Sequence, residues 1–468
     1  MRNFFLLVFI ACFFNTSAQT VSQKINNALN TFLKDEQLKH AIAGLYVTDE
    51  NGNKVFALNE QYGLAPASTQ KVFTSIAALS LLGKDFTYKT EIGYNGNISN
   101  NLLNGDVIIK GYGDPTFGSW RYSKTQPDSV LNFIVTAIKN SGIQKINGNI
   151  ILNDGVFSYQ PTPGGYIWED MGNYYGSGSW AINWRENQYD LVLKPGKNIG
   201  DTSTVIKTNP TLSIHDYSNF ITTADENSGD NTILYLPPYG SSAFAEGTIP
   251  KGVKDFTVSG AVAYAADQFK TELDSSLKKN SITVSGDIST GASLEKQRIK
   301  IPSAQQNIAT YTSPTLDSIV YWFLQKSINL YGECLLKTIA YQKDGFGSTD
   351  IGVNEIKKFW QQNGVDSSSL NISDGSGLSP QNRVTTYALV NALLYAEKQN
   401  WFQSFYNALP VSNNMKLKSG TISGVRCFAG YYTAASGKKY VLAIMVNNYD
   451  ADKGSITPKI FKVLDALK

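Results

Sequence analysis

The sequence predicts an α/β (α+β) fold in which one domain, built from both ends of the chain, is interrupted by a long and mostly β insertion. Helical hydrophobic periodicity occurs near both ends, whereas the middle consists of short strand-like runs separated by turns rich in Asn and Gly. The 468 residues suffice for about three domains, and 42% hydrophobic with 17% charged residues is typical of globular proteins.

The N-terminal part of the chain combines a helix, a hairpin and a buried helix. Residues 22–33 have the spacing of a short amphipathic helix. Residues 42–48 and 54–58 flank a Glu-Asn-Gly-Asn turn, which predicts a β-hairpin. Residues 69–82 carry apolar side chains at helical spacing and are followed by Gly83, which predicts a mostly buried helix that ends there.

The middle of the chain is predicted to be a β-rich insertion, after which helices return. Strands are expected at 90–94, 106–110, 146–152 and 282–284, helices at 261–277, 315–326, 331–341, 353–363 and 385–398, and a β-rich stretch at 416–447 precedes a closing helix at 458–467. We therefore expect a signal peptide at 1–18, a split domain at 19–86 and 295–468, an insert domain at 87–190 and 256–294, and a small β domain at 191–255 nested in the insert.

The charge and the potential ligands exclude several classes of function. Lys and Arg number 41 and Asp and Glu 38, and a net charge of +3 is far from the basic excess of a nucleic-acid-binding protein. The two histidines, His40 and His215, lie in unrelated contexts and only three cysteines occur, so neither a Ser-His-Asp triad nor a zinc site is expected. The chain has no P-loop and no H-E-x-x-H motif. We expect no metal and no cofactor.

The N-terminus has the pattern of a secretory signal peptide. A basic residue precedes the apolar run at 4–14, and small residues lead to a cleavage point after Ala18. The run is too short to span a bilayer and no other stretch reaches about 20 apolar residues, so we expect a secreted, periplasmic protein without a stable transmembrane segment. A lipoprotein anchored through Cys12 stays open as an alternative. Cys334 and Cys427 remain after cleavage, and the sequence leaves open whether they form a disulfide.

Ser68 and Lys71 form the first candidate for chemistry. Without a suitable histidine, a neutral lysine can activate a hydroxyl group. The two residues are three positions apart at the start of the predicted helix, so the Lys71 amine can reach Ser68 Oγ. Free N–H groups at the start of a helix also favour developing negative charge. A lysine is neutral near pH 7 only where it is buried or beside another cation, so this mechanism requires a second positive group.

A Ser-Ile-Asn triplet, Ser327 to Asn329, is the second candidate. It lies between two predicted helices, where a tight turn would project the Ser327 hydroxyl and the Asn329 amide into a cleft. The triplet S-x-N also occurs in polar loops of this chain, so it is a weak signal when taken alone.

The third candidate is the segment Lys418-Ser419-Gly420-Thr421 on a predicted strand, the one K-[ST]-G motif in the sequence. Lys418 would be the second cation, and the hydroxyl groups of Ser419 and Thr421 are suited to a carboxylate. Gly420 would let a substrate backbone approach the strand edge closely.

In this order the three motifs resemble S-x-x-K, S-x-N and K-[ST]-G of penicillin-binding proteins and class A β-lactamases. Ser327 follows Ser68 by 259 residues, which is too long for an ordinary β-lactamase. The spacing resembles the D-alanyl-D-alanine carboxypeptidase/endopeptidases of the low-molecular-mass class C penicillin-binding proteins, which insert two domains there. Further landmarks of this family lie at 111–116, 150–157, 165–170, 312–316, 374–379 and 429–431. Ile328 and Ser419 depart from the usual Asp and Thr.

The resemblance implies a β-lactamase/transpeptidase-like domain with an antiparallel sheet and helices. It also implies a serine-type D-alanyl-D-alanine carboxypeptidase/endopeptidase that acts on peptidoglycan stem peptides and is inhibited by β-lactams. Ser68 would be the nucleophile, Lys71 its base and Ser327 a proton relay. The residues implied to bind substrate are Asn329, Lys418, Ser419, Gly420 and Thr421, with Asp154 at the free amine of the stem.

Two alternatives stay open. One is a β-lactamase or esterase on the same fold, and the other is a catalytically weak penicillin-binding sensor or wall-binding protein. The three intact motifs disfavour a decayed site, and the long insertion disfavours an ordinary β-lactamase. The sequence does not predict the oligomeric state.

Overall fold

The computed structural model describes residues 19–212, 214 and 216–468. The predicted signal peptide and Cys12 lie outside these residues. Within the described part, none of the helices combines the length and the hydropathy needed to cross a bilayer.

A six-stranded antiparallel sheet joins the two ends of the chain. Its strand order is β2-β1-β24-β23-β22-β21. The strands are β1 (Ile42–Asp49), β2 (Lys54–Leu58), β21 (Val411–Ser412), β22 (Met415–Ile422), β23 (Val425–Thr433) and β24 (Lys439–Asn447). β1 pairs with β24 along its whole length, so the predicted N-terminal hairpin is completed by strands from the C-terminal end.

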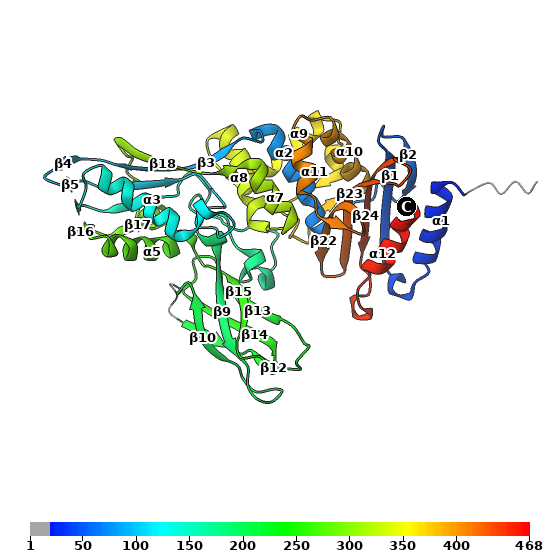
Figure 1. Cartoon of the computed structure of the whole chain (residues 1–468), viewed down its shortest axis with the longest axis horizontal. Helices are drawn as coiled ribbons and strands as arrows, with labels where there is room; N and C mark the ends of the chain where they lie inside the picture. The colour runs from blue at the N-terminus through cyan, green and yellow to red at the C-terminus, as the bar shows by residue number, and fades with distance from the viewer. Residues whose placement is uncertain (1–18, 213, 215) are drawn as a thin grey trace, which may run out of the picture.

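Helices cover both faces of this sheet. α1 (Val21–Phe32) and α12 (Thr457–Leu464) share a hydrophobic cluster with one face, at the right of Figure 1. The cluster on the other face includes α2 (Lys71–Leu82), α7 (Leu316–Gln325), α8 (Asn329–Asp344), α9 (Thr349–Gln362), α10 (Thr386–Glu397) and α11 (Phe402–Ala408). Val72, Phe73 and Ile76 of α2 are fully buried there. Because protein interiors are close-packed, this burial fixes the position of the residues at the start of α2.

The insertion begins and ends in one pair of strands. β3 (Thr87–Tyr94) pairs with β18 (Gln306–Thr315), with Thr87 opposite Thr315, so both connections to the split domain run side by side. They belong to a five-stranded sheet of order β17-β8-β6-β3-β18. Because β18 lies in the sheet of the insertion, we propose that the split domain resumes at residue 316 rather than 295.

Two sheets and two long helices form the first part of the insertion, at the left of Figure 1. The strands are β4 (Asn97–Ser99), β5 (Leu102–Asn104), β6 (Val107–Gly111), β7 (Lys145–Asn147), β8 (Ile150–Asn153), β16 (Thr283–Val284) and β17 (Ile288–Thr290), and the helices are α3 (Pro127–Asn140), α5 (Ala265–Lys279) and the short α6 (Gly291–Lys296). The predicted helix at 261–277 corresponds to α5. Helix α3 is absent from the predicted elements, although Val130, Ile134 and Ile138 are buried at helical spacing.

The second part of the insertion is a β domain that extends downward in Figure 1. β9 (Gln188–Lys194), β10 (Thr204–Asn209) and β15 (Phe256–Ala261) form one sheet, and β11 (Asp216–Asn219), β12 (Thr222–Ala224), β13 (Asn231–Tyr235) and β14 (Ser242–Pro250) form another. The predicted fold class, an antiparallel sheet with helices interrupted by a long β-rich insertion, is confirmed.

Candidate active site

Ser68 lies in a tight turn at the start of a buried helix. The turn is a 3₁₀ helix, Ala67–Gln70, which runs directly into α2. Ala67 has φ +46°, a left-handed conformation that costs free energy for a residue with a Cβ and is concentrated at functional sites. Ser68 is half-buried, whereas Lys71 is fully buried, with Nζ 2.9 Å from Ser68 Oγ. The predicted pairing of this hydroxyl and this amine is present.

The Lys71 amine has two further partners, and both accept hydrogen bonds. Nζ lies 2.6 Å from Asn329 Oδ1 and 2.7 Å from the Ser376 carbonyl oxygen. Burial lowers the pKa of Lys71 to about 7, against the opposing charges of Asp374 and Glu333. A neutral amine has two hydrogens and one lone pair. When both hydrogens go to the two acceptors, the lone pair faces the Ser68 hydroxyl.

The amide of Asn329 is oriented by the insertion. Its Nδ2 donates to the carbonyl oxygen of Tyr175, which belongs to the insertion, at 2.7 Å. A carbonyl oxygen can only accept, so this bond assigns Nδ2 to Tyr175 and Oδ1 to Lys71. The second hydrogen of Nδ2 remains available toward the cleft, where Asn329 is a lining residue.

Lys418, in the K-[ST]-G motif, contacts Ser327, in the S-x-N motif. Its Nζ donates to Ser327 Oγ at 3.0 Å and to the Ser419 carbonyl oxygen at 2.8 Å. Ser327 has φ +56°, which is the tight turn expected between two helices. Burial first, and the charge of Lys71 second, lower the pKa of Lys418 well below its usual value. The predicted cause of a low Lys71 pKa was the charge of Lys418, but the cause in the structure is the burial of Lys71 itself.

Gly420 allows β22 to lie against the Ser68 turn. A Cβ at this position would lie 2.5 Å from the Pro66 carbonyl oxygen and 2.9 Å from Ser68 N, closer than real contacts allow. On the same strand Thr421 is exposed and lines the cleft, and Ser419 is half-buried. The Arg426 guanidinium donates to the Thr421 hydroxyl.

These residues open onto a cleft of about 880 Å³ between the split domain and the insertion. Ser68, Ser327, Ile328, Asn329 and Thr421 line it from the split domain. The insertion contributes Arg121, Ile167, Asp170, Tyr174, Tyr175 and Gln188. The structure therefore brings all three motifs together at one cleft.

Asp154 is not among the residues that line this cleft. Asp154 is 2% exposed, its carboxyl group accepts a hydrogen bond from Tyr264 Oη, and burial raises its pKa to about 6. The role predicted for Asp154, direct contact with the amine of a bound stem, is therefore not supported by its position.

Asp170 is the acidic residue that does line the cleft. It lies in α4 (Trp168–Met171) and is hydrogen-bonded to the Tyr175 side chain. Burial raises the pKa of Asp170 to about 6, and the neighbouring charge of Glu169 adds to the shift. The landmark at 165–170 contains Asp170, but no local signal shows which acid of the insertion faces the cleft.

Two buried carboxyl groups hold the loop that carries the Ser376 carbonyl. Glu333 accepts the backbone N–H of Gly375 at 3.1 Å and the hydroxyl of Tyr166, from the insertion, at 3.1 Å. Asp374 accepts the N–H groups of Gly377 and Ser379 and the side-chain amides of Gln70 and Asn382. Burial and the nearby Asp374 raise the pKa of Glu333 to about 7. The sequence marks this loop only as a landmark and does not indicate that Tyr166 and Glu333 support Lys71.

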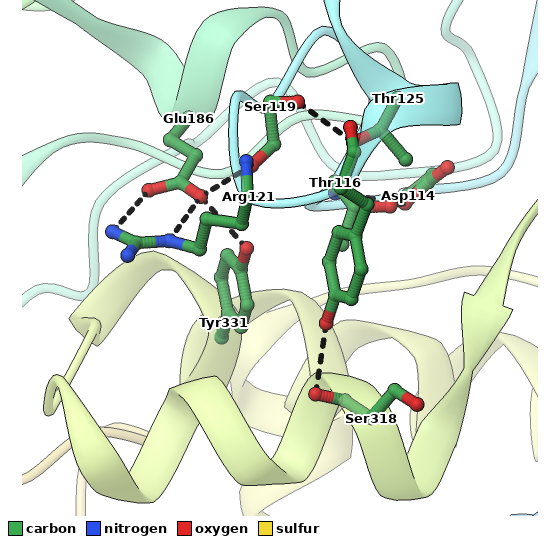
Figure 2. A network of polar contacts seen from close by, with 9 residues as sticks. Asp114, Thr116, Ser119, Arg121, Thr125, Glu186, Ser318 and Tyr331 are labelled. Atoms are coloured by element: carbon green, nitrogen blue, oxygen red, sulfur yellow. Dashed lines mark hydrogen bonds and ion pairs between the residues drawn. The ribbon is translucent and has the colours of Figure 1, made fainter.

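A second buried network joins the insertion to α8 beside the cleft (Figure 2). The side chain of Glu186 is fully buried and forms an ion pair with Arg121. Glu186 Oε1 also accepts the hydroxyl groups of Ser119 at 2.7 Å and of Tyr331, on α8, at 2.8 Å. Arg121 is thus fixed at the cleft by a carboxylate that contacts both parts of the molecule.

Both cysteines of the described chain, Cys334 and Cys427, are buried free thiols. Burial raises the pKa of each thiol, so neither is a reactive thiolate. Among residues 19–212, 214 and 216–468, no cluster of His, Cys, Asp and Glu side chains is arranged to hold a metal ion.

Comparison with known proteins identifies the family of this chain. The family model of the D-Ala-D-Ala carboxypeptidase 3 (S13) family matches residues 25–466. The chain is 26% identical to D-alanyl-D-alanine carboxypeptidase DacB of Haemophilus influenzae, with 87% of this chain and 85% of that protein covered. It is 25% identical to a D-alanyl-D-alanine carboxypeptidase of Actinomadura sp. (strain R39), with 95% and 84% covered.

A solved structure shows the same fold. The crystal structure of penicillin binding protein 4 (dacB) from Haemophilus influenzae superimposes with a TM-score of 0.80 at 24% identity, covering 95% of this chain and 98% of that one. The family match, which extends over nearly the whole chain, includes all three motifs and the insertion. The chain therefore belongs to the D-Ala-D-Ala carboxypeptidase 3 (S13) family of serine peptidases.

Proposed function

We propose that this D-Ala-D-Ala carboxypeptidase works through an acyl-enzyme on Ser68, with neutral Lys71 as the base. One observation carries the proposal: Lys71 Nζ is 2.9 Å from Ser68 Oγ, and its two other partners, Asn329 Oδ1 and the Ser376 carbonyl, can only accept hydrogen bonds. This arrangement favours the amine form in which the lone pair points at the hydroxyl. A nucleophile and its base within hydrogen-bond reach are the geometric requirement for covalent catalysis.

In the acylation step Ser68 Oγ bonds to the carbonyl carbon of the terminal peptide bond while its proton passes to Lys71. The C–N bond then breaks, and the amine of D-alanine, or of a crosslinked stem, leaves with the proton that Lys71 took from Ser68, passed on through Ser327, which Lys418 holds at 3.0 Å. Lys71 is then neutral again. The backbone N–H groups of Ser68 and Thr421 are proposed as the oxyanion hole, which is worth about 3 kcal/mol per donor.

In the deacylation step water attacks the ester carbonyl carbon and the bond to Ser68 Oγ breaks. Lys71 takes the proton of the attacking water and returns a proton to Ser68, so the free enzyme is restored. No other group within the described residues combines a buried amine with direct contact to Ser68 Oγ.

Substrate binding is proposed to use both walls of the cleft. The terminal carboxylate would bind at β22, where Thr421 lines the cleft and Ser419 and Lys418 belong to the same strand. The free Nδ2 hydrogen of Asn329 would donate to a backbone carbonyl of the stem. Asp170, in place of Asp154, would attract a free amine of the stem from the insertion side.

The biological substrate is proposed to be the stem peptide of peptidoglycan, reached after secretion to the periplasm. β-Lactams resemble the D-alanyl-D-alanine end and are expected to acylate Ser68. The alternative of an efficient β-lactamase predicts rapid hydrolysis of the acyl-enzyme, and the alternative of a sensor predicts labelling without peptidase turnover.

Labelling with a fluorescent penicillin tests the proposal. Wild type should be labelled and Ser68→Ala should not. Ser275→Ala is the matched control, because Ser275 and Lys278 have the same S-x-x-K spacing on the exposed side of α5. D-Alanine release from a pentapeptide, measured beside penicillin turnover, separates the peptidase from the two alternatives. Equal labelling of wild type and Ser68→Ala would refute the assignment of the nucleophile.

A further inference from the structure

We propose that Arg121 binds a second free carboxylate of the substrate, one that the stem carries in addition to its terminal carboxylate. The inference rests on the proposed peptidase function and assigns a further specificity residue to the same cleft. Arg121 comes from the insertion, lines the cleft that contains Ser68, and has a side chain that is 15% exposed.

One edge of the Arg121 guanidinium is already occupied. Nε donates to Glu186 Oε1 at 2.7 Å and Nη2 donates to Glu186 Oε2 at 3.0 Å, as Figure 2 shows. This two-point pairing fixes the plane and the direction of the group. Among the described residues, Nη1 has no hydrogen-bond partner, so the outer edge retains donors for an acceptor that enters the cleft.

Two tryptophan rings restrict the guanidinium further. Arg121 Cζ lies 5.5 Å from the ring centroid of Trp120 and 5.2 Å from that of Trp322, both within the range of cation–π attraction. Trp322 belongs to α7, which leads into the Ser327 turn. The cation is therefore preorganised in the cleft that contains Ser68, and little rotamer entropy remains to be lost when it binds an anion.

The segment that carries Glu186 has an energetically unfavourable backbone conformation. Arg185, Glu186 and Asn187 have φ values of 55°, 53° and 55°, three consecutive residues in the left-handed region. Such strain is typical of functional segments. Glu186 is also fully provided with donors, from Arg121, Ser119 and Tyr331, so it does not need the outer edge of Arg121.

The charges around the cleft indicate the class of ligand. In the proposed function, Lys418 and the hydroxyl groups of β22 bind the terminal carboxylate, and Asp170 attracts a cationic group. Arg121 offers two fixed, parallel N–H donors, which is the geometry that carboxylates match. Lys326 also lines the cleft, but its side chain is exposed and has no partner that would fix it among the described residues.

Two pairs of peptides test the inference with the wild-type enzyme. In the first pair, a pentapeptide ending in D-alanyl-D-alanine carries either a D-glutamyl residue with a free α-carboxylate or the corresponding carboxamide. In the second pair, the third residue is meso-diaminopimelate with a free or an amidated side-chain carboxylate. We expect kcat/KM for D-alanine release to be about tenfold or more higher for the carboxylate form of one pair, and that pair identifies which carboxylate binds.

The variants then assign the effect to Arg121. In Arg121→Gln the carboxylate-to-carboxamide ratio should fall to about one, mainly through KM, whereas Lys326→Gln should retain the wild-type ratio. If Arg121→Gln does not fold, Arg121→Lys replaces it in the test. This variant keeps the positive charge but loses the two parallel N–H donors, so its carboxylate-to-carboxamide ratio should lie between one and the wild-type value. Equal rates within both pairs, or a ratio lost in Lys326→Gln and kept in Arg121→Gln, would overturn the inference and leave the peptidase function intact. No D-alanine release from any of the peptides would refute the peptidase function itself.

Discussion

Replacing Gly420 by Ala should push β22 away from the turn that carries Ser68. The added Cβ would lie 2.5 Å from the Pro66 carbonyl oxygen and 2.9 Å from Ser68 N. Ordinary van der Waals contacts begin at 3.4 Å, so β22 and the turn must move apart by several tenths of an ångström to about 1 Å. A misplacement of about 1 Å at reacting groups can reduce rates about 100-fold. We therefore expect the rate of Ser68 acylation to fall by one to two orders of magnitude.

The assay is the second-order rate of labelling by a fluorescent penicillin, beside D-alanine release from a pentapeptide. Gly164→Ala is the matched control, because a Cβ at Gly164 would meet nothing within 4 Å. Thermal unfolding of both variants distinguishes a displaced strand from a misfolded protein, since overpacking costs about 1–3 kcal/mol of stability. If folded Gly420→Ala is labelled at the wild-type rate, the close seating of β22 against the Ser68 turn is not needed for acylation, and the reasoning is refuted.

Two further predictions concern the insertion. Asp170→Asn should raise KM several-fold for a stem peptide with a free side-chain amine but not for the acetylated form of that peptide. Asp154→Asn should leave this preference unchanged. If steady-state kinetics show the reverse, with the preference lost in Asp154→Asn, the amine is bound by Asp154. Tyr166→Phe removes a donor from Glu333 and a partner from Ser376, so acylation should slow about tenfold. Tyr122→Phe, which removes another tyrosine hydrogen bond from the insertion to the split domain, should not change acylation, and equal effects of the two would contradict a specific role for Tyr166.

The sequence predicted those parts of the site whose residues are close together in the chain or belong to motifs shared with a known family. Ser68 and Lys71 are one helical turn apart, so their contact follows from helix geometry alone. The approach of Ser327 and Lys418 depends on segments far apart in the chain, and only the order of the motifs and the family resemblance predicted it. The fold class followed from the same resemblance and from the change in periodicity between the ends and the middle.

The residues that the sequence analysis missed act through long-range contacts. Arg121, Asp170 and Tyr175 line the cleft, and Tyr166 contacts Glu333, because the insertion packs against the split domain. No local spacing encodes that packing. Asp154 shows the same difficulty, because the motif around it does not reveal that its side chain is buried against Tyr264. The cause of the low pKa of Lys71 also needed the structure, since burial of a single side chain is not readable from a motif.

The pH dependence of Ser68 acylation tests the central claim most directly. The reactive form has a neutral Lys71, so the rate should fall about tenfold per pH unit below its pKa and reach a plateau above it. With burial lowering the pKa of Lys71 to about 7, the second-order rate of penicillin labelling should show its midpoint near that pH. A rate that is flat from about pH 5 to about pH 9, or one that still rises toward the ordinary pKa of a lysine, 10.5, would contradict the account.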